Sequence, residues 1–209
     1  NKANLHLSID GSGSMSGTPM NVAIAMGIFA SSFAHPAFRD RFISFESTPR
    51  WIVLRYPKNY SEYQSKQEFS SSTIGSWDAT RAGGELTLYE KVMVATQSPW
   101  GGTTDFVAAH ELILEACVNA NLGPEDLPEW FMILSDMQFN DANRPAYSRN
   151  YWFINQHLGV NYKSTANWTP IHEMLGRAYH TAGMKACGRP YSVPQQIYWN
   201  LRGDTVGFP

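Results

Sequence analysis

The stretch Leu5–Met15, with the sequence LHLSIDGSGSM, decides the fold of this chain. Its first six residues form a short, mostly apolar run that ends in Asp10, which is typical of a buried strand. Two serines, Ser12 and Ser14, follow at alternate positions, each preceded by a glycine. A loop this flexible lets one carboxylate and two hydroxyls wrap a single hard cation, and such oxygens suit Mg²⁺ or Mn²⁺. Because these oxygens are too few to close a cage, the turn predicts a metal site that takes a further ligand.

Apolar strands alternate with helical patterns along the rest of the chain. Thr18-Pro19 predicts a helix start, and Val22, Met26, Phe29 and Phe33 follow as one apolar stripe of an amphipathic helix. Residues 57–85 show no convincing period and are expected to be loop and short helix. Further strands are predicted at 41–45, 51–55, 130–136 and 196–201, and further helices at 86–95, 106–117 and 169–183.

This alternation predicts one α/β domain over residues 1–209, with a doubly wound, mainly parallel sheet flanked by helices. In such sheets ligands bind beyond the carboxyl ends of the strands. Three polar clusters stand directly after strands or before helices, at Asp10–Ser14, Thr103–Asp105 and Asp136. We therefore expect these clusters, although distant in sequence, to converge at one edge of the sheet.

The Asp-x-Ser-x-Ser turn, the Gly-Gly-Thr-Thr-Asp turn and the strand ending in Ser-Asp together resemble von Willebrand factor type A domains. The resemblance implies a Rossmann-like fold with a metal-ion-dependent adhesion site. It assigns five residues to that site: Asp10, Ser12, Ser14, Thr104 and Asp136. The hydroxyls bind the cation directly or nearly so, and the aspartates act largely through water, which leaves one position for an acidic side chain of a partner. Thr103 stays open as the alternative to Thr104.

More narrowly, four stretches look like an uncharacterised family of plant, fungal and giant-virus proteins that carry an A-type domain in a longer polypeptide. These stretches are Asp10–Met20, Trp100–Phe106, Leu134–Met137 and Tyr198–Arg202. The chain begins without an initiator methionine and stops soon after a predicted strand. We therefore expect a fragment of a longer protein with a truncated C-terminus.

The amino-acid composition limits the classes of partner that this chain is expected to bind. The 16 basic and 18 acidic side chains give a net charge of −2, without the basic clusters of a nucleic-acid reader. No apolar stretch approaches the ~20 residues that span a bilayer, so neither a membrane nor direct nucleic-acid binding is expected. The two cysteines do not form a disulfide framework. They favour an intracellular, cytoplasmic setting, which for a viral member is the host cytoplasm or the virion.

Several of these residues also have plain structural explanations. A Gly/Ser turn capped by an aspartate accounts for Asp10–Ser14 taken alone, and Asp136 could cap a strand end. Asp105 is expected to be the N-cap of its own helix rather than a ligand. His6 and His110 fall on apolar patterns and are expected in the interior rather than at a metal.

Three functions compete. The first is a binding module that presents a divalent cation to a carboxylate of a protein partner. The second is an Mg²⁺-dependent phosphoryl-transfer or hydrolytic enzyme, disfavoured because Ser12 stands where an acid–base residue would be needed and no phosphate loop with Gly-Lys-Ser/Thr occurs. The third is an assembly domain of a ribonucleoprotein, as in A-type domains beside RNA-binding repeats. We expect the first and do not expect an enzyme.

Overall fold

The computed structural model describes residues 5–46, 48–66, 69, 71–101, 105–136, 152–160 and 168–202. The strands are β1 (Leu5–Asp10), β2 (Arg41–Phe45), β3 (Trp51–Val53), β4 (Trp130–Ser135) and β5 (Gln195–Asn200). The α-helices are α1 (Thr18–Phe33), α2 (Tyr60–Ser65), α3 (Ser71–Ile74), α4 (Leu88–Gln97), α5 (Phe106–Asn119) and α6 (Trp168–Cys187). Shorter helical turns span Gly13–Met15, Ala79–Arg81, Pro124–Asp126 and, as a π-helix, Phe153–His157.

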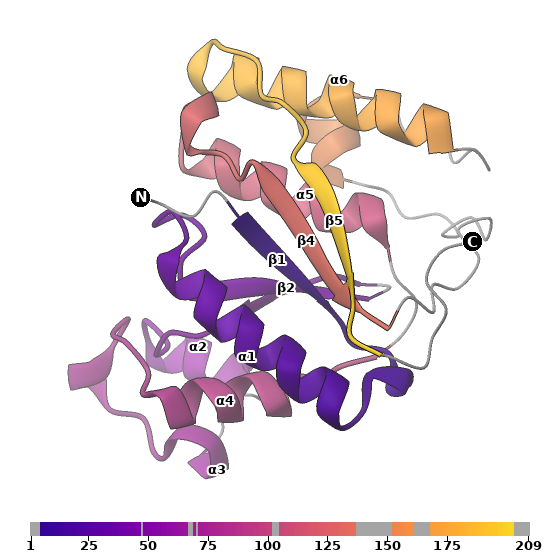
Figure 1. Ribbon diagram of the computed structural model, residues 1–209. Coiled ribbons are helices and arrows are strands. Elements are labelled where there is room, and N and C mark those ends of the chain that lie inside the picture. The colour runs from indigo at the N-terminus through magenta and orange to yellow at the C-terminus, as the bar shows by residue number, and fades with distance from the viewer. Residues whose placement is uncertain are drawn as a thin grey trace.

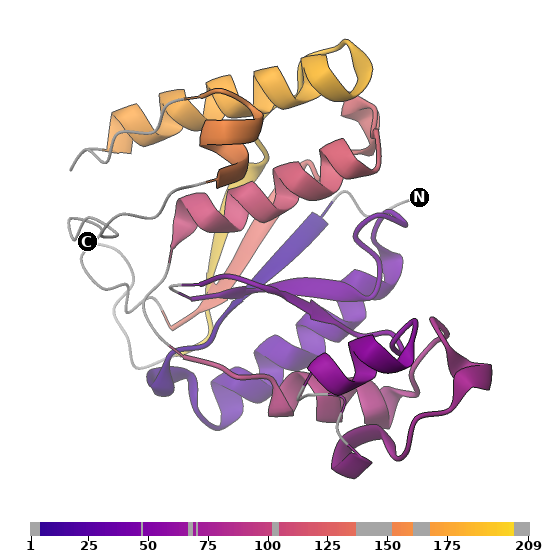
Figure 2. The ribbon, with the colours of Figure 1, turned by 180° about the vertical axis from the view of Figure 1, so that it is seen from behind.

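The strands form one sheet in the order β3-β2-β1-β4-β5. β1 runs parallel to both β2 and β4, β4 runs parallel to β5, and only the hairpin strand β3 is antiparallel to its neighbour. Figures 1 and 2 show three layers, with α1 and α4 on one side of the sheet and α5 and α6 on the other. The predicted α/β architecture with a mainly parallel, helix-covered sheet is confirmed, and it is compatible with a Rossmann-like fold.

The central strand β1 sends alternate residues to the two faces, as a pleated strand must. Leu7 and Ile9 join the apolar core beneath α1 and α4. On the opposite face, the ring of His6 lies against Phe38 and Phe131 of the core beneath α5 and α6. β1 is buried on both faces, which explains why its sequence reads as a nearly unbroken apolar run.

Helix α1 turns a different side to the sheet from the one predicted. Phe29 and Phe33 of the predicted stripe are 62% and 54% exposed, and Val22 is exposed too. The buried side instead carries smaller and branched residues: Ala23, Ile24, Gly27, Ile28 and Ser31. The reason is close packing, because a Cβ at Gly27 would lie 2.9 Å from side-chain atoms of both Ile9 and Phe42.

The predicted helix starts are mostly correct within one or two residues. Thr18 is the first residue of α1 rather than its cap, because Gly17 occupies the cap position with a φ of 87° that favours glycine. Asp105 caps α5 as expected, accepting a hydrogen bond of 2.9 Å from the backbone N–H of Ala108.

The histidine and cysteine predictions can also be compared with the structure. His6 and His110 are buried in the core, as expected, and Cys117 is buried there too. Cys117 and Cys187 are both free thiols. Across the described ranges, no helix combines the length and apolar character that crossing a bilayer requires.

Candidate metal centre

Asp10 stands at the carboxyl end of β1 and is only 1% exposed. Its Oδ1 accepts a hydrogen bond of 2.9 Å from the backbone N–H of Ser12, which folds the glycine-rich turn back over the strand end. Its Oδ2 accepts one of 2.7 Å from the hydroxyl of Ser135, at the end of β4. The aspartate therefore joins two neighbouring strands that are 125 residues apart in sequence.

The two serine hydroxyls of the turn lie beside each other above this carboxylate. Ser12 Oγ and Ser14 Oγ are 2.9 Å apart, close enough to share a hydrogen bond, and both residues are half-buried. Neighbouring ligands of an octahedral Mg²⁺ at 2.0–2.1 Å stand about 2.8–3.0 Å apart, whereas the longer bonds of Ca²⁺ need roughly 3.3–3.7 Å. The spacing of the hydroxyl pair therefore equals that of neighbouring ligands of Mg²⁺, as it also equals that of an ordinary hydrogen bond.

Asp136 follows β4 and is fully buried, one residue after the serine that binds Asp10. Burial raises the pKa of Asp10, hydrogen bonds from Ser135 and Ser12 lower it, and the negative charge of Asp136 raises it further. The net shift is upward because burial, the largest cause, outweighs these hydrogen bonds. Asp10 and Asp136, predicted to converge from separate strands, are thus brought within electrostatic reach.

The second predicted turn is described only at its two flanks. Thr104, the predicted ligand, and its alternative Thr103 lie outside the described residues. On the preceding flank, a Cβ at Gly11 would lie 2.8 Å from the Trp100 ring and 3.2 Å from the backbone nitrogen of Gly101. The start of the second turn therefore presses directly on the first, immediately beside Asp10.

On the following flank, Asp105 is buried and its backbone N–H donates to the Glu46 carbonyl oxygen at 3.1 Å. Glu46 comes directly after β2, so this contact ties the second turn to the carboxyl end of a third strand. Gly101 and Asp105, the described flanks of the second turn, therefore both lie at this edge of the sheet.

Three contacts at this site involve residues that the sequence analysis did not propose as site residues. Ser135 fixes Asp10, Arg202 donates from Nη1 to the Ser14 carbonyl oxygen at 3.2 Å, and an ion pair between Glu46 and Arg50 borders the second turn. Arg202 ends the stretch Tyr198–Arg202, which overlaps β5, and Ser135 lies in the stretch Leu134–Met137, so both stood in segments that the sequence singled out. Nothing in the local sequence pattern indicates the Glu46–Arg50 pair, because its contact with the second turn depends on another segment.

The donor set matches a hard, octahedral cation better than a soft one. Two carboxylates and two hydroxyls are oxygen donors, and Mg²⁺ or Mn²⁺ prefers such ligands while keeping several waters. Within the described segments, no group of three or more His, Cys, Asp or Glu side chains is arranged to hold a metal. Any ion at this edge would therefore depend on the serine hydroxyls as well as on the two aspartates.

Comparison with known proteins places the chain among proteins without an assigned role. Residues 69–209 match a protein family described as a domain of unknown function, DUF7788. The chain is also 31% identical over 194 residues to the uncharacterised protein L728 of Acanthamoeba polyphaga mimivirus. That alignment covers 93% of this chain but only 24% of the viral protein, so the chain spans about a quarter of its relative's length.

Proposed function

We propose that this chain, which belongs to the DUF7788 family, is a metal-dependent binding module organised like a von Willebrand factor type A domain. In this proposal Mg²⁺ or Mn²⁺ binds directly to Ser12, Ser14 and Thr104. Asp10 and Asp136 hold the ion largely through water. One remaining position takes the carboxylate of a protein or peptide partner, in a reducing intracellular compartment.

The 2.9 Å spacing of the Ser12 and Ser14 hydroxyls, set above the buried carboxylate of Asp10, carries the proposal. Buried carboxylates that repel each other are stabilised by a bound cation. The geometry therefore supports a cation site more strongly than a simple capped turn.

The same geometry supports an anionic group as the external ligand of the cation. Neutral hydroxyls leave a bound cation with strong attraction for an external carboxylate. Arg202 adds a positive charge next to Ser14, and α1 begins shortly after the turn with its positive dipole end nearby. Because these features attract and hold an anion, and Ser12 stands where an acid–base residue would be needed, we propose binding rather than catalysis.

The first test measures Mn²⁺ affinity by titration calorimetry for the wild type, Asp10→Asn and the control Asp78→Asn. Asp78 is exposed and caps the unrelated turn at 79–81, so its substitution should leave the affinity unchanged. Asp10→Asn should weaken Mn²⁺ binding by about 10–100-fold, because it removes a charged partner that holds the ion through water. Equal affinities in all three proteins would contradict the proposal.

The same variant should make the metal-free protein more stable at pH 7. The pKa of Asp10 is raised in the folded state, so folding binds a proton more tightly and stability falls as pH rises through this pKa. Asparagine has no such charge to desolvate. If the metal-free Asp10→Asn protein melts at a lower temperature than metal-free wild type, the buried charge of Asp10 does not destabilise the empty site. This result would count against the proposed cation site.

A second experiment separates binding from catalysis. Immobilised protein should retain a carboxylate-bearing partner in Mg²⁺ and release it in chelator, and Asp10→Asn should retain none. Partner retention unaffected by chelator would remove the metal-dependent docking role. Mg²⁺-dependent hydrolysis of p-nitrophenyl phosphate that Asp10→Asn abolishes would favour the enzyme instead.

A further inference from the structure

We infer that Arg202 makes the proposed cation site selective for an anionic ligand. Its positive charge lowers the affinity of the site for the cation alone and raises the affinity of the cation-loaded site for a carboxylate. This inference rests on the proposed function and adds a residue outside the predicted ligand set. Arg202 acts by its charge and position and is not a ligand of the cation, so it is a specificity-determining residue.

The backbone of Arg202 is fixed at the carboxyl end of β5. Ser135 of β4 pairs with Asn200, and the backbone N–H of the next residue, Leu201, donates to the Ser135 carbonyl oxygen at 2.9 Å. The backbone N–H of Arg202 donates to Asn200 Oδ1 at 2.9 Å, as in an Asx turn. The point from which the Arg202 side chain leaves the chain is therefore set by contacts with the sheet.

The Arg202 side chain reaches the turn that carries two of the predicted ligands. Its Nη1 donates to the Ser14 carbonyl oxygen at 3.2 Å, although β4 lies between β1 and β5 in the sheet. The guanidinium therefore extends across the carboxyl end of β4 toward the turn after β1. Figure 1 shows the ends of these three strands at the same edge of the sheet, close to the start of α1.

These contacts complete a closed ring of hydrogen bonds beside the proposed site. Ser135 Oγ donates to Asp10 Oδ2 at 2.7 Å, and Asp10 Oδ1 accepts from the backbone N–H of Ser12 at 2.9 Å. The Ser12 and Ser14 hydroxyls are 2.9 Å apart. Arg202 links Ser14 back to the segment that is bonded to Ser135, and every member of the ring is a described residue. Contacts from three strand ends therefore fix the guanidinium relative to the predicted ligands of the first turn.

The charge of Arg202 has opposite effects on the two ligands of the site. A cation held by the Ser14 hydroxyl would stand on the same residue whose carbonyl oxygen binds the guanidinium, so the two positive charges repel each other. A carboxylate that completes the coordination of the cation is attracted by both charges. Loss of local structure would instead weaken both ligands, because Ser14 would no longer be held in place. The sign of the change in cation affinity therefore distinguishes a charge effect from loosening.

Lysine and glutamine separate charge from hydrogen bonding at this position. Both variants lose the planar fork of arginine, whereas only lysine keeps a positive charge. The comparison of Arg202→Gln with Arg202→Lys therefore isolates the charge. Arg202→Met, which also removes the charge, takes the place of Arg202→Gln if that variant does not fold.

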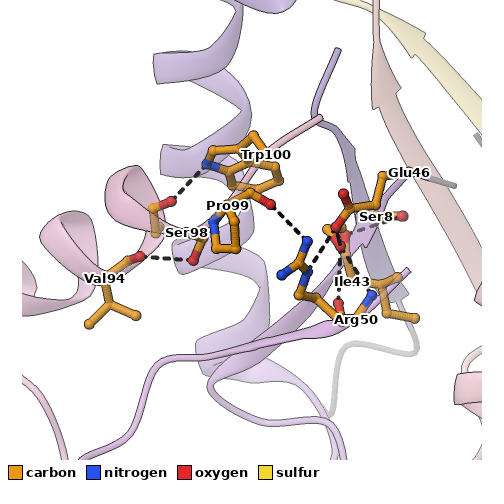
Figure 3. Close-up of polar contacts among 10 residues, drawn as sticks. Ser8, Ile43, Glu46, Arg50, Val94, Ser98, Pro99 and Trp100 are labelled. Atoms are coloured by element: carbon orange, nitrogen blue, oxygen red, sulfur yellow. Dashed lines mark hydrogen bonds and ion pairs between the residues drawn. The ribbon is translucent and has the colours of Figure 1, made fainter. Parts of the chain in front are cut away.

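Arg189 offers a matched control for the removal of one positive charge. It donates from Nη2 to Glu125 Oε1 at 3.0 Å, and Glu125 belongs to the helical turn before β4, at the opposite edge of the sheet. Arg50 is unsuitable, because its guanidinium contacts Glu46 and the Pro99 carbonyl oxygen near the carboxyl edge, as Figure 3 shows. Arg189→Gln should leave the affinities for both the cation and the carboxylate unchanged.

The experiment measures two affinities for wild type, Arg202→Gln, Arg202→Lys and Arg189→Gln, each first checked by urea unfolding without metal. Calorimetry in a carboxylate-free buffer gives the Mn²⁺ affinity. Water-proton relaxation of the Mn²⁺-loaded protein gives the affinity for acetate, which displaces water from the ion. Arg202→Gln should bind Mn²⁺ about fivefold more tightly than Arg202→Lys, and acetate about threefold more weakly, as one charge near a partly exposed site does. Equal affinities in the two Arg202 variants, weaker Mn²⁺ binding in Arg202→Gln, or the same changes in Arg189→Gln would overturn the inference.

Ionic strength provides a readout that a merely structural role would not move. Raising the KCl concentration from about 0.1 M to about 1 M shortens the Debye length from about 10 Å to about 3 Å. The difference in Mn²⁺ affinity between Arg202→Gln and Arg202→Lys should therefore shrink toward zero. A difference that persists in full at the higher salt concentration would overturn the charge-based role.

The proposed function fails separately from this inference. A wild type that binds no Mn²⁺, or an Asp10→Asn protein that binds normally, overturns the metal site and this inference with it. Loss of binding in Asp10→Asn together with equal affinities in Arg202→Gln and Arg202→Lys overturns only the role of Arg202.

Discussion

The helices pack against the two faces of the sheet in different ways. On the α1 face the helix approaches so closely that Gly27 has no room for a side chain, and its contacts are apolar. On the α5 face two buried histidines share the core with aromatic rings, and His110 Nδ1 lies 2.9 Å from the Tyr179 hydroxyl. Burial lowers the pKa of His6 and of His110 to about 3, with Arg41 also contributing at His6, so both rings are neutral.

This difference helps to interpret the carboxylates at the sheet edge. A neutral buried ring costs less to bury than a charged group, even where, as at His6 Nε2, the described residues supply no hydrogen-bond partner. Asp10 and Asp136 are buried as deeply as the histidines, and a carboxylate that keeps its charge is stabilised by a nearby cation. The histidines therefore serve packing, whereas the aspartates sit where a cation would be stabilising.

The close approach on the α1 face predicts the largest effect. Gly27→Leu would force four carbon atoms against Ile9 and Phe42, so urea unfolding should show a loss of about 3 kcal/mol or more. Gly176→Leu is the matched control, since Gly176 lies within α6 and no atom of the described residues stands within 4 Å of an added Cβ. The control should gain about 0.5–1 kcal/mol from helix propensity. Equal changes in unfolding free energy for Gly27→Leu and Gly176→Leu would contradict the closer helix packing proposed for the α1 face.

The α1 helix also shows where sequence reasoning failed. Its residues are apolar nearly all round, so a stripe at helical spacing did not identify the buried side. Phe29 and Phe33 have the larger apolar area, but Gly27 and Ala23 allow the closer fit to the sheet. That preference depends on Ile9 and Phe42 in other strands, which a pattern within one helix does not contain.

The buried histidines on the α5 face predict that the stability of the protein depends on pH. The pKa of His110 falls from 6.5 to about 3 on folding, so between these values the unfolded chain binds a proton that the folded chain does not. Stability is therefore lost as pH falls through this window, by up to about 1.4 kcal/mol per pH unit for each such histidine. His110→Gln should make the slope of unfolding free energy between pH 4 and 6 shallower by about this amount.

The control for this slope is His180→Gln. His180 is exposed on α6, so its replacement should leave the pH dependence unchanged. If His110→Gln keeps the full slope of unfolding free energy against pH, the buried ring is not the group that takes up a proton on unfolding. The two faces of the sheet would then differ in packing but not in this titration.

The candidate site was predictable where it depends on strand ends. Asp10 and Asp136 each end an apolar run, and parallel strands bring their carboxyl ends together, so their convergence followed from the sequence. The Glu46–Arg50 pair was not predictable, because it acts on Pro99 from a different segment. Short polar runs after strands therefore indicate where a site lies. The side chains that hold those runs in place are determined by contacts between distant segments, which the sequence pattern does not contain.

The smallest effect is expected on the outer side of α1. Phe29 and Phe33 pack against each other with ring centroids 5.1 Å apart, but more than half of each residue is exposed. Phe29→Ser should therefore change the unfolding free energy by no more than about 0.5 kcal/mol, the usual range for surface positions. Ile28→Ser, one residue earlier and buried, should lose several-fold more, because it also buries a hydroxyl. A loss above about 1.5 kcal/mol for Phe29→Ser in urea unfolding would mean that the predicted stripe packs against the folded chain after all.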